Sequence, residues 1–297
     1  MNGSWSAQPD RVSEREMVTL EDAFATYCGL STPKLLPPEL TWPFATISAK
    51  VASQQRVEPN GNVARSLRQT SCYFALARWL RRRRPGPLNI CEIGFNIGHS
   101  ATVFLTAVGT SARYVGFELS ARRYVTSASK VLNGSGLFPG RVELVYGDSL
   151  TSAPRFLAEH PRFRCDLLSV DGDHTIEHVL GDWRSFKSRL QDDHVVLFDD
   201  ISHHHPIFTS RKRRDPDLHL VGCLRLNGEA DDEESLRLFQ MQRARRRNVT
   251  RPLTASDAFC VARRVTAADA VVRKWTVKRT PGDKEAFYMA GPKLPTK

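Results

Sequence analysis

The segment Leu88–Ser100, which reads LNICEIGFNIGHS, constrains the fold of this chain more than any other stretch. A short apolar run ends beside Glu92 and is followed by Gly94, Gly98 and a helix-like segment at Ala101–Val108. This order predicts a strand, a glycine turn and a helix start, as in doubly wound α/β folds, where glycines let the backbone approach a ligand closely. The spacing E-x-G-x-x-x-G differs from the G-x-G-x-x-G that holds a dinucleotide pyrophosphate. It favours a ligand with a nucleoside and a cationic amino-acid end but no phosphate.

An alternation of strands and helices follows this segment. Alternation of this kind argues for a parallel sheet with helices on both faces. We therefore expect a Rossmann-like, doubly wound α/β fold with a mostly parallel, seven-stranded type of sheet and an N-terminal helical extension. Strands are predicted at 88–93, 113–117, 142–146, 166–170 and 194–198, helices at 121–132 and 175–190, and late strands at 257–265 and 286–289.

The flanks of this region are less regular. Four prolines between Leu20 and Lys50 predict only short helical pieces there, before a better helix at about Val63–Arg83. A further helix is predicted from the acidic cluster at Asp231–Glu234 through Arg247. We expect a disordered leader at 1–20, a helical cap at 21–87, the main domain at 88–265 and a basic extension at 266–297.

Each predicted core strand ends in an acid. In open α/β sheets ligands bind outside the carboxyl ends of the strands, so these acids should converge on one rim. Any one of them could instead serve a turn or a helix N-cap, but five successive strands argue for a ligand site. The acids are Glu92, Glu118, Asp148, Asp171, Asp173, Asp199 and Asp200.

The acids after the fourth and fifth predicted strands form a tighter group. Asp171 and Asp173 follow one strand, and Asp199 and Asp200 follow its expected neighbour, about 4.8 Å away. Such a cluster repels itself unless protons or a cation neutralise it. Oxygen ligands of this kind suit Mg²⁺ or Mn²⁺, which would also make a coordinated hydroxyl a better nucleophile.

The glycine turn with its acids resembles motif I of the class I S-adenosylmethionine-dependent methyltransferases. The resemblance implies that Glu118 takes the ribose hydroxyls, that Asp148, with help from Ser149, meets the adenine amino group, and that Glu92 lies beneath the methionine part. The cofactor-binding candidates are Glu92, Gly94, Asn96, Gly98, Ser100, Glu118, Asp148, Ser149 and Asp171.

The runs LLSVDGDHTIEHVLGDW and VVLFDDISHH are similar to metal-dependent O-methyltransferases that act on sugar hydroxyls of macrolide and aminocoumarin antibiotics. The resemblance implies that Asp171, Asp199 and Asp200 bind Mg²⁺ or Mn²⁺ and that Asp173 is the general base. His174 is a second candidate for the base. The expected reaction is methyl transfer from S-adenosylmethionine to the hydroxyl of a small molecule, and the oligomeric state stays open.

Three further functions remain open. The central residues 90–205 carry a net charge of −3, whereas the flanks carry +5 and +9. The basic flanks, with arginine runs at 81–84, 211–214 and 245–247, allow a methyltransferase acting on RNA or protein, although no nucleic-acid motif accompanies them. The same fold could also carry a divergent enzyme of another chemistry, since fold does not fix function. A non-catalytic module that binds the cofactor is the third possibility.

The remaining histidines and the cysteines carry weaker signals. His203, His204 and His205 cannot all face one ion from an extended chain, so they are interpreted as a polar loop over the site. His99 is interpreted as a possible cap or packing residue, and His178 and His194 are expected on solvated surfaces. The six cysteines form no C-x-x-C pair and favour free thiols over a disulfide framework. No signal peptide or membrane span is evident, so a cytoplasmic protein is expected.

Overall fold

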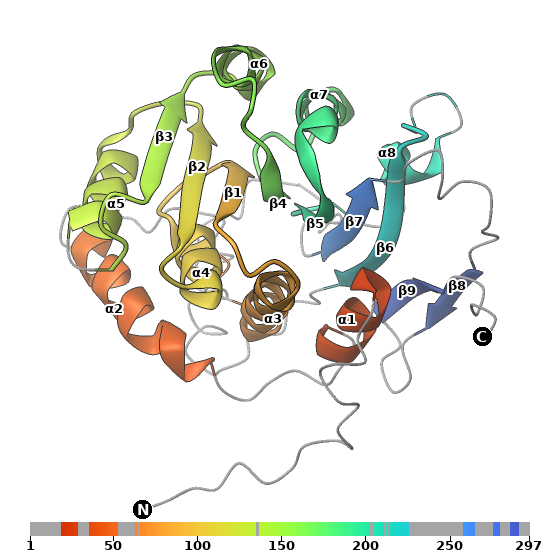
Figure 1. Ribbon diagram of the computed structural model, residues 1–297, viewed down its shortest axis with the longest axis horizontal. Helices are drawn as coiled ribbons and strands as arrows, with labels where there is room; N and C mark the ends of the chain where they lie inside the picture. The colour runs from red at the N-terminus through yellow and green to blue at the C-terminus, as the bar shows by residue number, and fades with distance from the viewer. Residues whose placement is uncertain are drawn as a thin grey trace, which may run out of the picture.

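The computed structural model describes residues 19–28, 36–52, 63, 66–134, 137–201, 205–210, 212, 214–225, 258–264, 276–279 and 286–290. These residues build one sheet of nine strands in the order β3-β2-β1-β4-β5-β7-β6-β9-β8 (Figure 1). The strands are β1 (Leu88–Ile93), β2 (Ala112–Glu118), β3 (Val142–Tyr146), β4 (Cys165–Val170), β5 (Leu190–Phe198), β6 (Leu218–Arg225), β7 (Ala258–Arg264), β8 (Thr276–Arg279) and β9 (Ala286–Ala290).

The first five strands pair in parallel, and β7 runs antiparallel to both β5 and β6. Strands β1 to β7 thus form the predicted mostly parallel, seven-stranded sheet, and the α/β fold class is confirmed. The hairpin of β8 and β9 extends this sheet through antiparallel pairing of β9 with β6. The late strands expected at 257–265 and 286–289 are β7 and β9, whereas β6 and β8 had no predicted counterpart.

Helices cover both faces of the sheet. Buried side chains of α1 to α5 form one core with the sheet, and those of α6 to α8 form a second core on the opposite face (Figure 1). No helix in the described part of the chain is long and apolar enough to cross a membrane. The helices are α1 (Leu20–Tyr27), α2 (Pro38–Ala52), α3 (Leu67–Arg83), α4 (His99–Val108), α5 (Arg123–Gly134), α6 (Ser149–Glu159), α7 (Ile176–Phe186) and α8 (Pro206–Thr209), with a 3₁₀ turn η2 (Lys187–Arg189) after α7.

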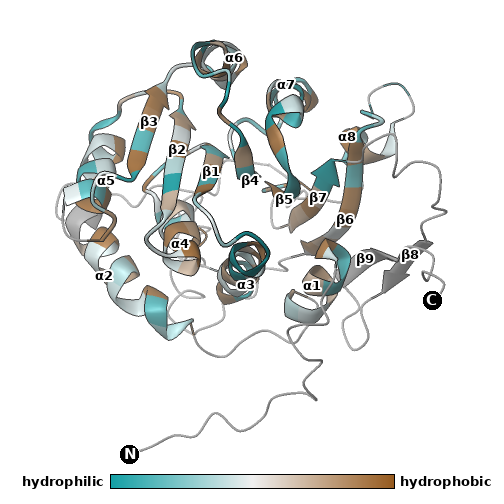
Figure 2. Ribbon diagram, in the orientation of Figure 1, coloured by the Kyte–Doolittle hydropathy of each residue, from teal (hydrophilic) through white to brown (hydrophobic). Residues whose placement is uncertain are grey.

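The two cores follow from the alternation of side chains along each strand. In β2, Tyr114 packs with α1 to α5 and Val115 packs on the other face. In β5, Val195 and Val196 divide in the same way. Figure 2 shows hydrophobic and hydrophilic colour on opposite sides of α3. A helix that packs one face on a core and exposes the other to solvent has this amphipathic pattern.

The expectation of only short helical pieces before Lys50 is wrong for α2, which runs for 15 residues with Pro43 inside it. Proline costs the helix one backbone hydrogen bond. That loss is offset because Leu40, Phe44 and Ile47 share one buried face of the helix, which packs against α4 and α5. Most of the leader expected at 1–20, and the helix expected at 231–247, lie outside the described residues.

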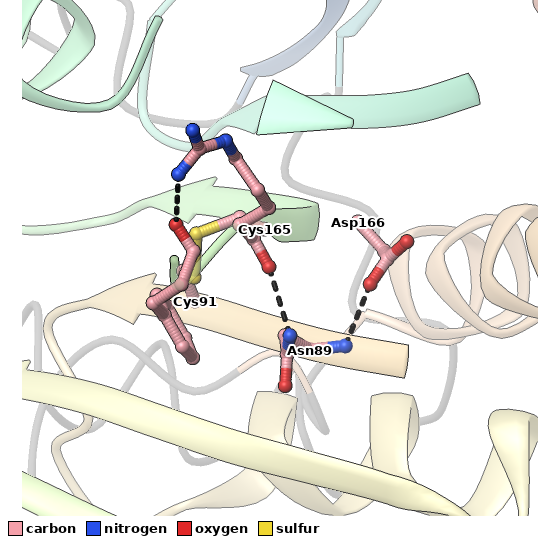
Figure 3. Close-up of a disulfide and its surroundings, with 6 residues drawn as sticks. Asn89, Cys91, Cys165 and Asp166 are labelled. Carbon is pink, nitrogen blue, oxygen red and sulfur yellow. Dashed lines mark hydrogen bonds between the residues drawn. A yellow bond between two sulfur atoms is a disulfide. The ribbon is translucent and has the colours of Figure 1, made fainter. Parts of the chain in front are cut away.

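The expectation of free thiols is also wrong, because all six cysteines are paired. Cys91–Cys165 joins the adjacent strands β1 and β4, beside the hydrogen bond from the Asn89 backbone N–H to Asp166 (Figure 3). A second bridge joins β6 to β7, and a third joins the end of α1 to α3. The partners stand 37 to 74 residues apart in sequence and become neighbours only through the sheet and the helix packing. The three bridges are Cys28–Cys72, Cys91–Cys165 and Cys223–Cys260.

Candidate functional site

The glycine turn between β1 and α4 is held close to the ends of two neighbouring strands. The Gly94 N–H donates to the Phe117 carbonyl of β2 at 2.8 Å. Gly94 has a φ of +89°, and a Cβ there would overlap the carbonyl oxygen of Asp171 after β4. Gly98 has a φ of +75°, and its Cβ would come within 2.7 Å of the Phe95 ring. These glycines therefore let the turn pack closely against the strand ends and against its own side chains.

Glu118, at the carboxyl end of β2, contacts this turn directly. The Asn96 backbone N–H donates to Glu118 Oε2 at 2.9 Å, and Asn96 itself has a positive φ of 51°. The next residue, Leu119, is 66% exposed although it is large and apolar. A partly exposed carboxylate thus lies between the glycine turn and an exposed apolar side chain, at the edge where the sequence predicts a nucleoside.

Asp148 and Ser149, after β3, are both engaged at the start of α6. The exposed Asp148 side chain caps this helix by accepting from the Leu150 N–H at 2.9 Å. Ser149 is the first residue of α6. Asp182 is buried in α7, and burial raises its pKa to about 6. Asp148 therefore performs the ordinary task of a helix cap, and it stands on the same rim as Glu118.

Glu92 lies fully buried in β1 under the glycine turn. The Tyr114 hydroxyl donates to its carboxylate. Burial raises the pKa of Glu92 to about 7, and hydrogen bonds from Tyr114, Ser100 and Ser169 oppose that shift. Close to neutral pH this side chain exchanges a proton in the interior of the protein, and a positive charge bound above it would favour its ionised form.

The acids after β4 and β5 influence one another strongly. Backbone hydrogen bonds place them side by side, from Asp171 N to the Ile93 carbonyl and from Asp199 N to the Val170 carbonyl. Burial, and then the charges of Asp199 and Glu92, raise the pKa of Asp171 well above its usual range. Burial, and then Asp200, raise the pKa of Asp199 to about 7. The structure therefore brings these carboxylates together, as the sequence predicts.

Two residues of α3 reach this cluster, and they were not predicted from sequence. Gln69 donates through Nε2 to Asp199 Oδ1 at 2.7 Å and to the Tyr73 hydroxyl at 3.1 Å. Both side chains are buried. The available signal was their spacing of four residues, which places both on the buried face of the helix. A buried glutamine on an otherwise apolar helix face requires a polar partner.

Asp173 and His174, the candidate bases, occupy different surroundings. Asp173 is exposed and accepts from the Thr175 N–H at 2.8 Å. Hydrogen bonds from the backbone and then the side chain of Thr175 lower the pKa of Asp173. His174 Nε2 lies 3.6 Å from Asp200 Oδ2, so His174 is the candidate base that borders the acid cluster.

The other histidines have structural partners. His205 caps α8, and burial lowers its pKa, whereas His203 and His204 lie outside the described residues. His99 is buried against α2, with Nε2 3.1 Å from the Ser48 hydroxyl, so the packing interpretation fits it. The expectation of a solvated His194 is wrong. It is buried and accepts from the Arg264 N–H at 2.7 Å, because β5 is covered there by β7.

The arginine run at the end of α3 is engaged within the protein. Arg84 forms a 2.7 Å ion pair with the buried Asp166, and Arg83 pairs with the side chain of Asp193. Arg82 donates to the Tyr27 hydroxyl and Arg81 to a backbone carbonyl in the next turn. This run therefore ties α3 to the sheet and to α1.

Within the described ranges, no group of three or more histidine, cysteine, aspartate or glutamate side chains forms a metal site. The chemistry of the donor set does fit a hard divalent cation, which prefers carboxylate oxygens. Burial and then mutual repulsion raise the pKa of Asp171 and of Asp199, and a bound cation would neutralise the charges that repel one another. Asp171, Asp199 and Asp200 are the residues that would hold it.

Residues 91–201 match the sequence model of a methyltransferase domain family. The matched segment contains the glycine turn, Glu118 and both acids after β5. Over residues 91–201 the chain therefore matches a methyltransferase domain, and the predicted resemblance to methyltransferases is confirmed for that segment. No curated protein matches the chain.

Several solved structures are similar to this chain. The O-methyltransferase from Bacillus cereus, solved with S-adenosylhomocysteine, is 17% identical, with 78% of this chain and 92% of that chain covered and a TM-score of 0.45. TomG from Streptomyces achromogenes, an O-methyltransferase of tomaymycin synthesis, is 20% identical, with 75% and 98% covered and a TM-score of 0.44. CalS11, a TDP-rhamnose 3′-O-methyltransferase of calicheamicin biosynthesis, is 15% identical, with 85% and 94% covered and a TM-score of 0.42.

Proposed function

We propose that this chain transfers the methyl group of S-adenosylmethionine to a hydroxyl oxygen of a small molecule, with a divalent cation at the ends of β4 and β5. One observation carries the proposal. Within a segment that matches a methyltransferase domain, the Glu118 carboxylate and the glycine turn are joined by a hydrogen bond at the carboxyl edge of the sheet. This is the edge where open α/β sheets bind ligands.

The cofactor would lie across the ends of β1, β2 and β3. Glu118 would accept from the ribose hydroxyls, and Asp148 with Ser149 would border the adenine. Glu92 would support the methionine end, because its buried carboxylate becomes a fixed negative charge when a sulfonium lies above it. The other contacts proposed for the cofactor are Gly94, Asn96, Gly98, Ser100 and Asp171.

Transfer to oxygen requires a hydroxyl that has lost its proton and lies in line with the sulfonium methyl. Asp173 is the weaker of the two proposed bases, because a carboxylate with a lowered pKa holds a proton poorly. His174 borders Asp200, with Nε2 3.6 Å from Oδ2, and histidine is the side chain that most often serves as a general base. We therefore favour His174 for accepting the hydroxyl proton, with Asp173 holding the start of α7 in place.

A cation held by Asp171, Asp199 and Asp200 would lower the pKa of a hydroxyl bound to it and fix its position. The residues of the chain contribute the negative cluster that attracts the ion. Mg²⁺ and Mn²⁺ are the expected ions, because both prefer oxygen ligands.

A small molecule is favoured over RNA or protein as the methyl acceptor. Two arginines of the run at the end of α3 are paired with carboxylates, Arg83 with Asp193 and Arg84 with Asp166, so part of its positive charge is neutralised within the protein. The arginines at 245–247 lie outside the described residues. The sugar hydroxyl implied by the sequence resemblance remains the first acceptor class to test.

Calorimetry with S-adenosylmethionine and S-adenosylhomocysteine tests the cofactor site. The wild-type protein should bind both, and Glu118→Ala should weaken binding by about 10- to 100-fold, as expected for the loss of hydrogen bonds to a charged group. Glu143→Ala is a matched control, because Glu143 is an exposed acid on β3 paired with Arg113. Absence of binding by the wild-type protein would contradict the proposed function, and an unchanged affinity in Glu118→Ala would remove Glu118 from the site.

A further inference from the structure

The contact between α3 and Asp199 links the N-terminal helices to the acid cluster. Gln69 and Tyr73 stand one turn apart on α3, and their side chains are only 6% and 1% exposed. Tyr73 is fixed by its neighbours, since its ring stacks on Phe104 of α4 and meets the edge of Phe259 of β7. These two polar side chains are therefore held rigidly, and both are directed at the end of β5.

The hydrogen bonds settle the orientation of the Gln69 amide. Its nitrogen donates to Asp199 Oδ1 at 2.7 Å and to the Tyr73 hydroxyl at 3.1 Å, so both amide hydrogens are used. The flipped amide would place its oxygen against a carboxylate oxygen, which is repulsive. Because the Tyr73 hydroxyl accepts from Gln69, it fixes the amide that donates to Asp199.

Asp199 Oδ1 thus accepts two hydrogen bonds, the first from Gln69. The second comes from the Asp200 backbone N–H, which lies 3.1 Å from the same oxygen. A carboxylate has about four lone-pair sites. These two donors therefore fix its orientation and still leave capacity for another ligand.

We propose that Gln69 and Tyr73 are positioning residues that hold the Asp199 carboxylate ready for the divalent cation. The inference rests on the proposed function, since it concerns the ion assigned to the acid cluster. Outer residues that orient a metal-binding side chain typically change metal affinity by about 10- to 100-fold when they are replaced. A purely structural link between α3 and the sheet would leave that affinity unchanged.

The test measures Mn²⁺ binding to the full chain, with free Mn²⁺ followed by electron paramagnetic resonance and no acceptor present. Gln69→Met removes the donor at similar volume, and Tyr73→Phe removes only the hydroxyl. Thr70→Val is the matched control, because Thr70 is buried on the same helix and its hydroxyl donates to the Val63 carbonyl at 2.7 Å, away from Asp199. Thermal unfolding and S-adenosylhomocysteine binding are measured for every variant.

We expect Gln69→Met and Tyr73→Phe each to weaken Mn²⁺ binding by at least about tenfold. Thr70→Val should stay within about twofold of wild type even where its unfolding temperature falls, because it loses stability without touching Asp199. Equal or tighter Mn²⁺ binding in both test variants would overturn the positioning role. If one of them does not fold, the other decides.

The wild-type protein separates this inference from the proposed function. A wild type that binds S-adenosylhomocysteine but no Mn²⁺ overturns the cation and the positioning role together, and leaves methyl transfer standing. A wild type that binds Mn²⁺ but no S-adenosylhomocysteine contradicts the proposed cofactor site. In that case the loss or retention of Mn²⁺ affinity in the variants still decides the role of Gln69 and Tyr73.

Discussion

Replacing Glu92 by glutamine should make the protein more stable at alkaline pH without a similar gain in acid. Glu92 is fully buried, and its neighbour Tyr114 donates a hydrogen bond that a glutamine carbonyl can also accept. Burial raises the pKa of Glu92 from 4.5 to about 7. Above that pH the folded protein must hold a negative charge in its interior, and glutamine removes this cost at nearly the same volume.

The sign and the size follow from proton linkage. Between pH 4.5 and 7 the folded state binds more protons at Glu92 than the unfolded state, so the free energy of unfolding falls as the pH rises. A shift of this size corresponds to about 3 kcal/mol in all. Roughly 2 kcal/mol of it falls between about pH 5.5 and pH 8. Glu92→Gln should lack this component, so its stability relative to wild type should rise by about that amount across the interval.

Urea unfolding at the two pH values measures the effect, with chelator present and no cofactor, so that no ligand alters the charges around Glu92. Asp173→Asn is a control of opposite sign, because the pKa of Asp173 is lowered by hydrogen bonds from Thr175. Its contribution to stability is already complete above about pH 5, so the pH dependence of this variant should match wild type over the interval. If Glu92→Gln also follows the wild-type pH dependence, the assignment of a buried, proton-exchanging Glu92 is refuted.

Three further predictions concern the fold. Gly94→Ala should lower the free energy of unfolding, measured with urea, by about 3 kcal/mol or more, because the new Cβ would overlap the Asp171 carbonyl at a positive φ. Gly86→Ala should be close to neutral, because a Cβ there meets nothing within 4 Å. Burial lowers the pKa of His194 to about 4, so the unfolded chain takes up this proton first as the pH falls from 6.5 to about 4, and the free energy of unfolding decreases. His194→Gln should lose up to about 3 kcal/mol less free energy of unfolding than wild type over this range. A pH dependence equal to that of wild type would contradict this. A thiol-specific reagent should label the unfolded protein only after reduction, and labelling of the unreduced protein would contradict the pairing. Reduction should also lower the urea midpoint of unfolding, because the three bridges close loops of 37 to 74 residues.

The central sheet could be predicted from sequence because each of its strands is a short apolar run closed by an acid or a glycine. The bounds predicted for β1 and β3 agree with the structure, and β5 only begins four residues earlier than predicted. The helix α6 was missed, since Pro154 lies within it and its start at Ser149 was interpreted only as part of a ligand contact. Strand β6 was missed because its pairing partner β7 lies more than thirty residues further along the chain.

The site was partly predictable for a similar reason. Acids at strand ends are visible in the sequence, and parallel pairing brings Asp171 and Asp199 together without further information. The spacing of Gln69 and Tyr73 indicates a buried polar pair, but their contact with Asp199 was not predicted, because it depends on how α3 lies against β5. The cysteine pairs, which join strands or helices distant in sequence, were wrongly predicted as free thiols for the same reason.

The transfer of a labelled methyl group tests the central claim most directly. The purified full chain is incubated with S-adenosylmethionine labelled in its methyl group, with Mg²⁺ and with a fractionated extract of small metabolites, and the products are followed by mass spectrometry. The proposed function predicts a labelled O-methyl ether that forms only with the protein present, disappears in chelator and returns when Mg²⁺ or Mn²⁺ is added. Label found on nucleic acid, on protein or on no molecule at all would contradict it.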